Sequence, residues 1–146
     1  MPFVYSVKFI CGTQAPSTAC TPVRQGAYTT EINIHNFHQP GGAAAHIQKR
    51  ILLLVSNNST PGLEPHTVTA QNFANITLPP DTATMDDCCN LGPNFAPGML
   101  NIGFLELVSD VQVSVTAVYT ATEVTASGGV GTGIAIDVQN IIPQQV

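Results

Sequence analysis

A two-residue alternation of apolar and polar side chains runs through most of this chain and limits it to β-structure. The segment 3–11, FVYSVKFIC, places large apolar side chains on one side and Ser6 and Lys8 on the other. The segment 28–36, YTTEINIHN, alternates in the same way. No segment longer than about ten residues has the 3.6-residue period of a helix. The pattern therefore predicts an all-β fold.

Turn-forming residues separate the alternating segments and indicate how they are organised. Their spacing predicts one antiparallel, jelly-roll-like β-sandwich of about seven to nine strands over residues 1–146, with flexible or interface-forming ends at 1–3 and 143–146. We expect a long loop at 81–98, with one helical turn near Asp86, and a glycine-rich connection at 128–133. Further strands are predicted at 46–55, around Val68, and at 76–78, 100–108, 111–124 and 134–142.

Two hairpins are predicted from the connections between strands. A two-residue turn at Ser109 and Asp110 joins 100–108 to 111–124. The breaker Pro40-Gly41-Gly42 separates 28–36 from 46–55, and pairing of residues whose numbers sum to 81 would place opposite charges together. The facing pairs in that register are Glu31 with Arg50, Asn33 with Gln48, and His35 with His46.

Charged residues are scarce: four Lys and Arg and nine Asp and Glu make up 9% of the chain, against about 25% in an ordinary domain. Without a cluster of cations, neither nucleic acid nor an anionic membrane surface is an expected partner. The apolar run 51–55 is far shorter than the ~20 residues of a membrane span, so no membrane insertion is expected. The N-terminus lacks the basic region of a signal peptide. We therefore predict a cytoplasmic location, with an extracellular one as the alternative.

The cysteines are Cys11, Cys20, Cys88 and Cys89. Because no secretion signal is visible, reduced thiols are predicted. The adjacent pair should place one side chain inward and the other outward on an extended backbone. The C-x-x-C spacing of a zinc site is absent.

Four histidines lie in the segment 35–66 and are the strongest candidates for a metal site. A cross-strand pair of His35 and His46, with His38 approaching from the loop, would supply ligands for zinc or copper. The competing interpretation is that they are exposed hydrogen-bonding side chains, and we favour it because residues three apart on a strand point to opposite faces. No cofactor is therefore predicted. The candidate ligand or interface residues are Glu31, Asn33, His35, His46, Gln48, Arg50, Asp86 and Asp87.

Motifs for catalysis are missing. The chain has no G-x-S-x-G elbow and no H-E-x-x-H pattern. The run GGVGTG at 128–133 is followed by a predicted strand and by no Lys-Ser or Lys-Thr, so it lacks what a phosphate loop uses. A noncatalytic protein is predicted.

The segments TEINIHN, ILLLV followed by GLEP, ITLPPDTATMDD and GFLELVSDVQVSVTAVYTAT cover about residues 28–125. In these segments the chain resembles the small bacterial β-sandwich proteins typified by the sensory rhodopsin transducer. The resemblance implies a soluble β-sandwich that forms a homo-oligomer and binds a partner or ligand without catalysis. The segment VKFICGTQ and the last strand depart from that pattern, and no functional residue is transferred.

Strands such as ILLLV and LNIGFLELV are apolar on both faces and need cover from both sides. Together with the low charge, they favour a self-assembling module that closes as a ring or extends as a filament. The first alternative is a carbohydrate or small-ligand binding module, or one that binds a partner protein, with its site on a sandwich face or in the segments 35–46 and 81–98. The second is a metal-dependent enzyme that uses His35, His38 and His46 with Glu31.

Overall fold

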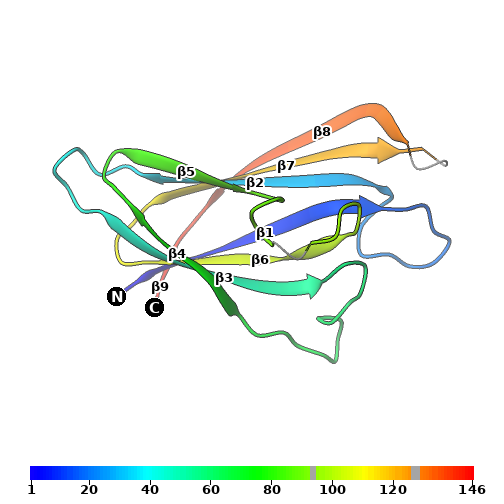
Figure 1. The fold of residues 1–146 in the computed structure, drawn as a ribbon, viewed down its shortest axis with the longest axis horizontal. Coiled ribbons are helices and arrows are strands. Elements are labelled where there is room, and N and C mark those ends of the chain that lie inside the picture. The colour runs from blue at the N-terminus through cyan, green and yellow to red at the C-terminus, as the bar shows by residue number, and fades with distance from the viewer. Residues whose placement is uncertain (93–94, 126–128) are drawn as a thin grey trace.

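The alternating segments form two packed layers of antiparallel strands in a computed structural model that describes residues 1–92, 95–125 and 129–146 (Figure 1). These residues contain nine strands and no helix, which confirms the predicted all-β sandwich. The strands are β1 (Phe3–Gln14), β2 (Gly26–Asn36), β3 (Ala45–Val55), β4 (Gln71–Leu78), β5 (Thr82–Asp87), β6 (Asn101–Ser109), β7 (Ser114–Val124), β8 (Val130–Ile141) and β9 (Gln144–Gln145).

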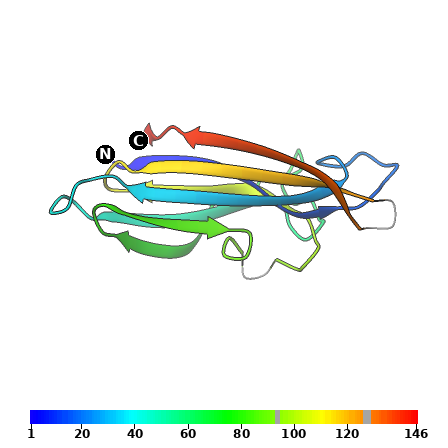
Figure 2. The same ribbon diagram turned by 90° about the horizontal axis from the view of Figure 1, so that it is seen from above.

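One layer, here called the β3 sheet, has the order β4-β3-β6-β1, with β9 paired to the start of β1. The other, the β2 sheet, contains β5, β2, β7 and β8, with β8 at its end. Figures 1 and 2 show the two termini beside each other at one end of the molecule. The segments predicted as flexible or interface-forming ends, 1–3 and 143–146, lie together there, and Phe3 pairs with Gln145.

The first strand belongs to both layers, and Gly12 is the residue at which it changes layer. Cys11 is the last residue of β1 paired with β6, and Gly12 is the first paired with β2. Gly12 has a φ of 101°, and a Cβ there would lie 1.9 Å from the Met99 carbonyl oxygen. Just before this point the Thr30 hydroxyl donates to the Ile10 carbonyl (3.0 Å) and accepts from the Ile10 N–H (2.9 Å). A side-chain hydroxyl thus joins β1 to β2 where the ladder has not yet begun.

The core lies between the layers and is filled by the apolar phase of each strand. The Tyr5 hydroxyl is buried there, donates to the Val113 carbonyl (2.8 Å) and accepts from the Val113 N–H (2.9 Å). Burial raises the pKa of Tyr5, partly offset by its hydrogen bond with the Val113 backbone. The largest fully buried apolar side chains are Tyr5, Val7, Phe9, Ile32, Ile34, Ile47, Leu91, Leu100, Leu105, Leu107 and Val115.

One buried ion pair joins the layers. Lys49 of β3 donates from Nζ to both carboxylate oxygens of Asp86 of β5, at 2.8 and 2.7 Å. Each side chain is only 7% exposed. Asp86, predicted as a ligand or interface residue, is therefore a core residue.

The prediction of a hairpin between 28–36 and 46–55 is wrong. The strand β2 pairs with β1, β5 and β7, while β3 pairs with β4 and β6 in the other layer. The connection crosses between layers and is held by Asn36, whose side-chain amide donates to the carbonyls of Ala43 (2.9 Å) and Leu78 (3.0 Å). The facing pairs of the predicted register do not form.

The prediction of a hairpin between 100–108 and 111–124 is also wrong, because β6 belongs to the β3 sheet and β7 to the β2 sheet. The crossing is fixed at two points: the Asp110 carboxylate accepts from the His46 backbone N–H (2.8 Å), and Tyr5 holds Val113. These contacts draw the connection from one layer to the other. The two hydrogen bonds to Val113 are long-range and follow no local pattern.

Three local expectations are corrected as well. The segment 81–98 contains β5, so Asp86 lies on a strand; a single turn follows directly after it, in which the N–H groups of Asn90 and Leu91 donate to the Asp87 carbonyl (both 2.9 Å). No strand forms around Val68, and β4 begins at Gln71. The strand β8 already begins at Val130 within the predicted connection at 128–133, of which Gly128 lies outside the described residues.

A disulfide joins Cys11 of β1 to Cys88 just after β5, so the prediction of reduced thiols is wrong at these two positions. Cys20 and Cys89 are free and exposed. The expected inward and outward placement of the adjacent cysteines is confirmed, because Cys88 is half-buried and Cys89 exposed. Within the described residues no helix is long and apolar enough to cross a membrane.

Candidate functional site

The strand β8 is exposed at every position from 133 to 140. It runs along one side of the sandwich and ends the strand order, so one of its edges has no partner among the described residues (Figure 1). Ile134, Ile136 and Val138 are 67%, 68% and 60% exposed. Asp137 is the only charged residue of its twelve. A long, apolar and unpaired edge of this kind is a template for another strand.

The exposed apolar residues of β8 share one face with their neighbours on β7. Ile134 lies opposite Thr122, Ile136 opposite Thr120, and Val138 opposite Val118. Through β7 the same face continues to Thr29, Glu31 and Asn33 of β2 and to Asp87 of β5. We call this surface the outer face of the β2 sheet.

The other edges of the sandwich are protected. The strand β4 is followed by Pro79 and Pro80, and its register with β3 shifts at Phe73, because Ala74 pairs with Lys49 and Asn72 with Arg50. The strand β5 has six residues and ends in two aspartates, and β9 has two residues. Short strands, charges and bulges are the usual means of blocking edge pairing. In β8 the register shift lies between Thr122 and Val124 of β7, which leaves 134–141 regular.

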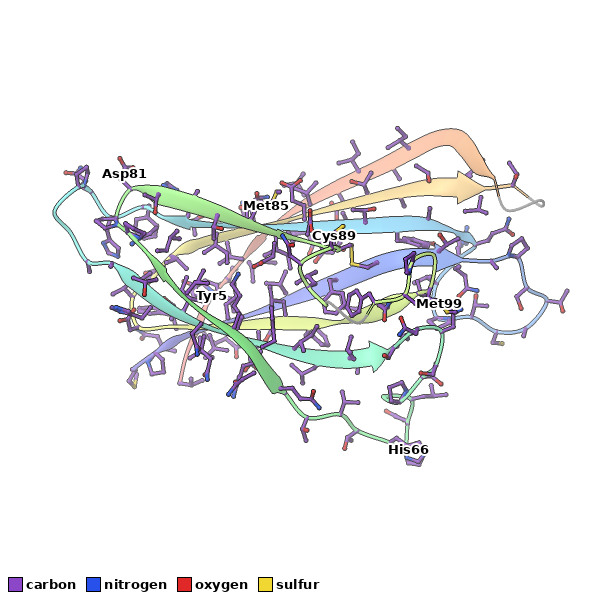
Figure 3. All side chains as sticks on the ribbon, viewed as in Figure 1. Tyr5, His66, Asp81, Met85, Cys89 and Met99 are labelled. Carbon is purple, nitrogen blue, oxygen red and sulfur yellow. A yellow bond between two sulfur atoms is a disulfide. The ribbon has the colours of Figure 1, made fainter. Side chains whose placement is uncertain are left out.

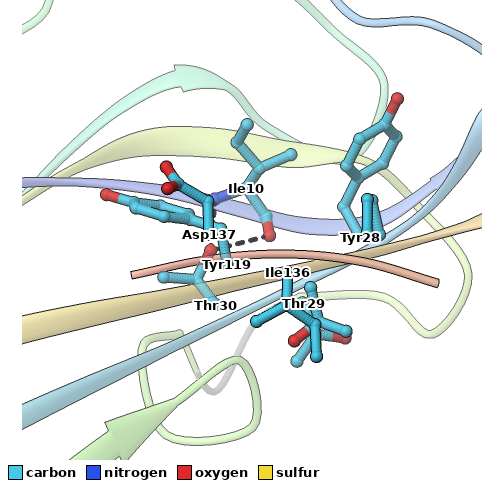
Figure 4. Close-up of a pocket in the computed structure, with 10 residues that line it drawn as sticks. Ile10, Tyr28, Thr29, Thr30, Tyr119, Ile136 and Asp137 are labelled. Atoms are coloured by element: carbon cyan, nitrogen blue, oxygen red, sulfur yellow. Dashed lines mark hydrogen bonds between the residues drawn. The ribbon is translucent and has the colours of Figure 1, made fainter. Parts of the chain in front are cut away.

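A small pocket of about 230 Å³ lies on the inner side of β8 (Figure 4). The Tyr119 hydroxyl in its wall donates to the Lys8 carbonyl (2.7 Å). Burial raises the pKa of Tyr119, and the nearby negative charge of Asp137 raises it further. Asp137 itself accepts a hydrogen bond from Gln139 (3.0 Å). The pocket is an apolar niche with a single carboxylate, and its wall also includes Ile10, Tyr28, Thr30 and Ala135.

The predicted site residues do not form one site. On the β2 sheet, the Asn33 amide donates to Glu31 Oε1 (2.9 Å). On the β3 sheet, Arg50 forms an ion pair with Glu106, the residue opposite it on β6. The set divides into Glu31, Asn33, His35 and Asp87 on the outer face of the β2 sheet, His46, Gln48 and Arg50 on the outer face of the β3 sheet, and Asp86 in the core.

The predicted histidine cluster is likewise dispersed because its hairpin does not form. His35 lies on β2, and His38 stacks on Phe37 with ring centroids 5.1 Å apart. His66 lies in the connection between β3 and β4 (Figure 3). Among the described residues no group of three or more His, Cys, Asp or Glu side chains is placed to hold a metal ion.

His46 and Asp110 form the polar pair of a groove on the β3 sheet. The His46 Nδ1 atom lies 2.7 Å from Asp110 Oδ2. Burial raises the pKa of Asp110, but hydrogen bonds from the backbone and ring of His46, together with the ring's charge, outweigh it and lower the pKa overall. The groove has a volume of about 420 Å³, and its other polar side chains are Gln48, Asn75, Thr77 and Ser109.

The sequence pattern predicts the strand at 134–142 but indicates no role for its side chains. The signal was present: Ile134, Ile136 and Val138 alternate with Ala135, Asp137 and Gln139. Alternation shows which residues share a face, but it does not show whether that face is covered. Only the strand order places β8 at an edge.

Comparisons with known proteins identify no family for this chain and one distant structural match. No family model matches the chain, and no curated protein matches it either. A crystal structure described as Thermotoga maritima 1070 is similar over 97% of this chain and 91% of its own, with 10% identity and a TM-score of 0.48. A likeness at that level carries no argument. The class of the molecule, a β-sandwich with an exposed edge strand, rests on its own structure.

Proposed function

We propose that this protein is a noncatalytic module that assembles with copies of itself through β8. The observation that carries the proposal is the unpaired edge of β8 with its three exposed apolar side chains. Pairing of this edge would satisfy backbone N–H and C=O groups and bring Ile134, Ile136 and Val138 against side chains of the partner, which removes part of their surface from water. The resemblance to homo-oligomeric β-sandwich proteins supports the same function.

The energy available is of the order that association requires. Full burial of an Ile or Val side chain is worth about 1.5–3 kcal/mol. Ile134, Ile136 and Val138 are 60–68% exposed in the single chain, and full burial would give roughly 3–6 kcal/mol for each subunit. Edge pairing covers the flank of each side chain that faces the partner and leaves its outer side in water, so it supplies a part of that gain. Association costs about 4–15 kcal/mol in lost freedom. Backbone hydrogen bonds, at roughly 0.5–1.5 kcal/mol each, add to the gain along the strand.

The charges of the β2 sheet favour contact at the edge over contact between faces. None of its strands β5, β2, β7 and β8 contains a lysine or arginine. Glu31 and Asp87 lie on its outer face, so stacking of two such faces would bring carboxylates together. Edge pairing leaves both carboxylates in solvent, because β7 separates β2 from β8.

Sedimentation velocity at micromolar concentration tests the proposal. The wild-type chain should sediment as a multiple of 15.3 kDa. Ile136→Lys should shift the population to monomer, because a charge then stands at the centre of the edge. Leu63→Lys is the matched control, since Leu63 is 64% exposed but lies in the connection between β3 and β4. A wild-type monomer, or equal effects of the two variants, would contradict self-assembly through β8.

The groove on the β3 sheet favours a second candidate function, the binding of a small polar ligand such as a carbohydrate. Its amide and hydroxyl side chains and the pair of His46 and Asp110 supply donors and acceptors. Titration with monosaccharides, followed by amide NMR shifts, should perturb His46, Gln48 and Asn75 if the groove binds them. Absence of shifts there, together with silence on a glycan array, would reject this function.

A further inference from the structure

We infer that the partner of β8 is the β8 of a second copy, paired antiparallel about a two-fold axis at Ile136. The inference rests on the proposed self-assembly and specifies its geometry. It is carried by two observations. The three exposed apolar side chains all lie on one face of β8, and Asp137, on the opposite face, is the only charged residue of the strand. Orientation and register follow from them in turn.

The orientation follows from the sidedness of the strand. A two-fold axis perpendicular to the sheet pairs the two edges antiparallel and keeps both outer faces on the same side. A two-fold axis parallel to the strands would pair the edges in parallel but turn one outer face over. In that arrangement the apolar side chains of the two copies would lie on opposite sides of the joined sheet. Only the antiparallel arrangement brings Ile134, Ile136 and Val138 of both copies together.

The register follows from the position of Asp137. Opposite residues of an antiparallel pair share a face, so the outer face of one copy continues into that of the other only where paired residue numbers have an even sum. A sum of 274 sets Asp137 directly against the partner's Asp137, and facing like charges are destabilising. A sum of 276 sets Ile136 against the partner's Asn140, and a sum of 270 sets Val138 against the partner's Thr132.

A sum of 272 avoids all three conflicts. Ile136 then faces the partner's Ile136, Ile134 faces the partner's Val138, and Ala135 faces the partner's Asp137. The two carboxylates are displaced by two residues, about 7 Å along the strand. Because Ala135 and Asp137 both line the niche on the inner side of β8, the niches of the two copies would meet at the axis.

Disulfide trapping reports this register directly. A cysteine can form a disulfide with the same residue of the second copy only if its number is half the sum that defines the register. The background is Cys20→Ser with Cys89→Ser, which removes the exposed free thiols and keeps the bond between Cys11 and Cys88. Single variants Ile136→Cys, Ala135→Cys, Asp137→Cys and Val138→Cys are oxidised mildly and separated on a non-reducing gel. Directly opposite residues have Cα atoms about 4.5–5.5 Å apart, within the range that a disulfide spans.

We expect Ile136→Cys to form a dimer, and Val138→Cys to form one only when mixed with Ile134→Cys. On its own, Val138 would lie about 14 Å along the strand from its copy. The mixed pair leaves Ile136 intact, so it also tests the register if Ile136→Cys weakens the contact. Trapping at Ala135, Asp137 or Val138 alone, or equally at every position, overturns the register while self-assembly stands. A wild-type monomer in sedimentation overturns both proposals.

Discussion

Removal of the Asp86 carboxylate should be among the most damaging single changes in this fold. In Asp86→Ala the Lys49 ammonium loses both of its hydrogen bonds, of 2.8 and 2.7 Å, while its side chain stays 93% shielded by the surrounding core. Breaking a buried pair by deleting one partner costs about 3–5 kcal/mol. A domain of ordinary stability has about 5–15 kcal/mol, so a large share of it would be lost.

A double-mutant cycle separates the cost of an orphaned charge from the value of the pair itself. The cycle consists of the single variants Lys49→Met and Asp86→Leu and of the double variant that carries both, in which no unpaired charge remains and apolar side chains replace the pair. Such replacements are often neutral or stabilising. We therefore expect the double variant to be more stable than Asp86→Ala by at least about 2 kcal/mol.

Urea unfolding followed by far-ultraviolet circular dichroism measures these differences through the midpoint and slope. Asp110→Ala is the matched control, because it also deletes an aspartate that contacts a basic side chain, His46, but this aspartate is 51% exposed. It should cost no more than about 1 kcal/mol. If Asp86→Ala costs as little as this control, or if the double variant loses the sum of the single losses, the reasoning about the core pair is refuted.

Four further changes test other parts of the structure. Gly12→Ala should prevent folding or cost about 3 kcal/mol or more, because it places a Cβ 1.9 Å from a backbone oxygen at a φ of 101°; a soluble variant with wild-type melting temperature would contradict this. Tyr5→Phe should lower the unfolding free energy by about 1–3 kcal/mol by leaving both backbone groups of Val113 without their partner, as measured in urea. Cys88→Ser should cost about 2–4 kcal/mol under oxidising conditions and nothing under reducing ones, since the bond closes a loop with a sequence separation of 77; thiol titration of the unfolded wild type should find the two free cysteines. The pKa of Asp110 lies below its ordinary value of 3.8, so its contribution to stability is present above that value and is lost as the pH falls through the lower folded pKa; the melting temperatures of wild type and Asp110→Asn should converge at acid pH.

The faces of the strands could be predicted from the sequence, but their neighbours could not. Alternation correctly placed Tyr5 and Phe9 on the buried side of β1 and Ile32 and Ile34 on the buried side of β2. A period of two says nothing about which strand lies beside which. The opposite charges of Glu31 and Arg50 were misleading because such a pair is worth only a few tenths of a kcal/mol, too little to choose a topology.

The alternation of β3 predicts one half of the buried ion pair, the burial of Lys49, but not its partner. In HIQKRILLLV, Lys49 falls on the same phase as Ile47 and Ile51, so the sequence alone places a cation on the apolar side of the strand. A lysine in that position requires a buried partner. The identity of the partner, Asp86, depends on β5 lying across the core from β3, which no local pattern encodes.

The low charge content has a meaning that composition alone could not give, because the charges are unevenly divided between the layers. Three of the four Lys and Arg residues lie on β1 and β3 of the β3 sheet. Lys8 sits 4.9 Å above the ring of Phe104, Lys49 pairs with Asp86, and Arg50 pairs with Glu106. The β2 sheet has carboxylates and no cation on its strands. Two copies therefore lack the opposite charges to join face to face there, and the nearly uncharged edge of β8 is the part of that sheet on which a second chain meets the least repulsion.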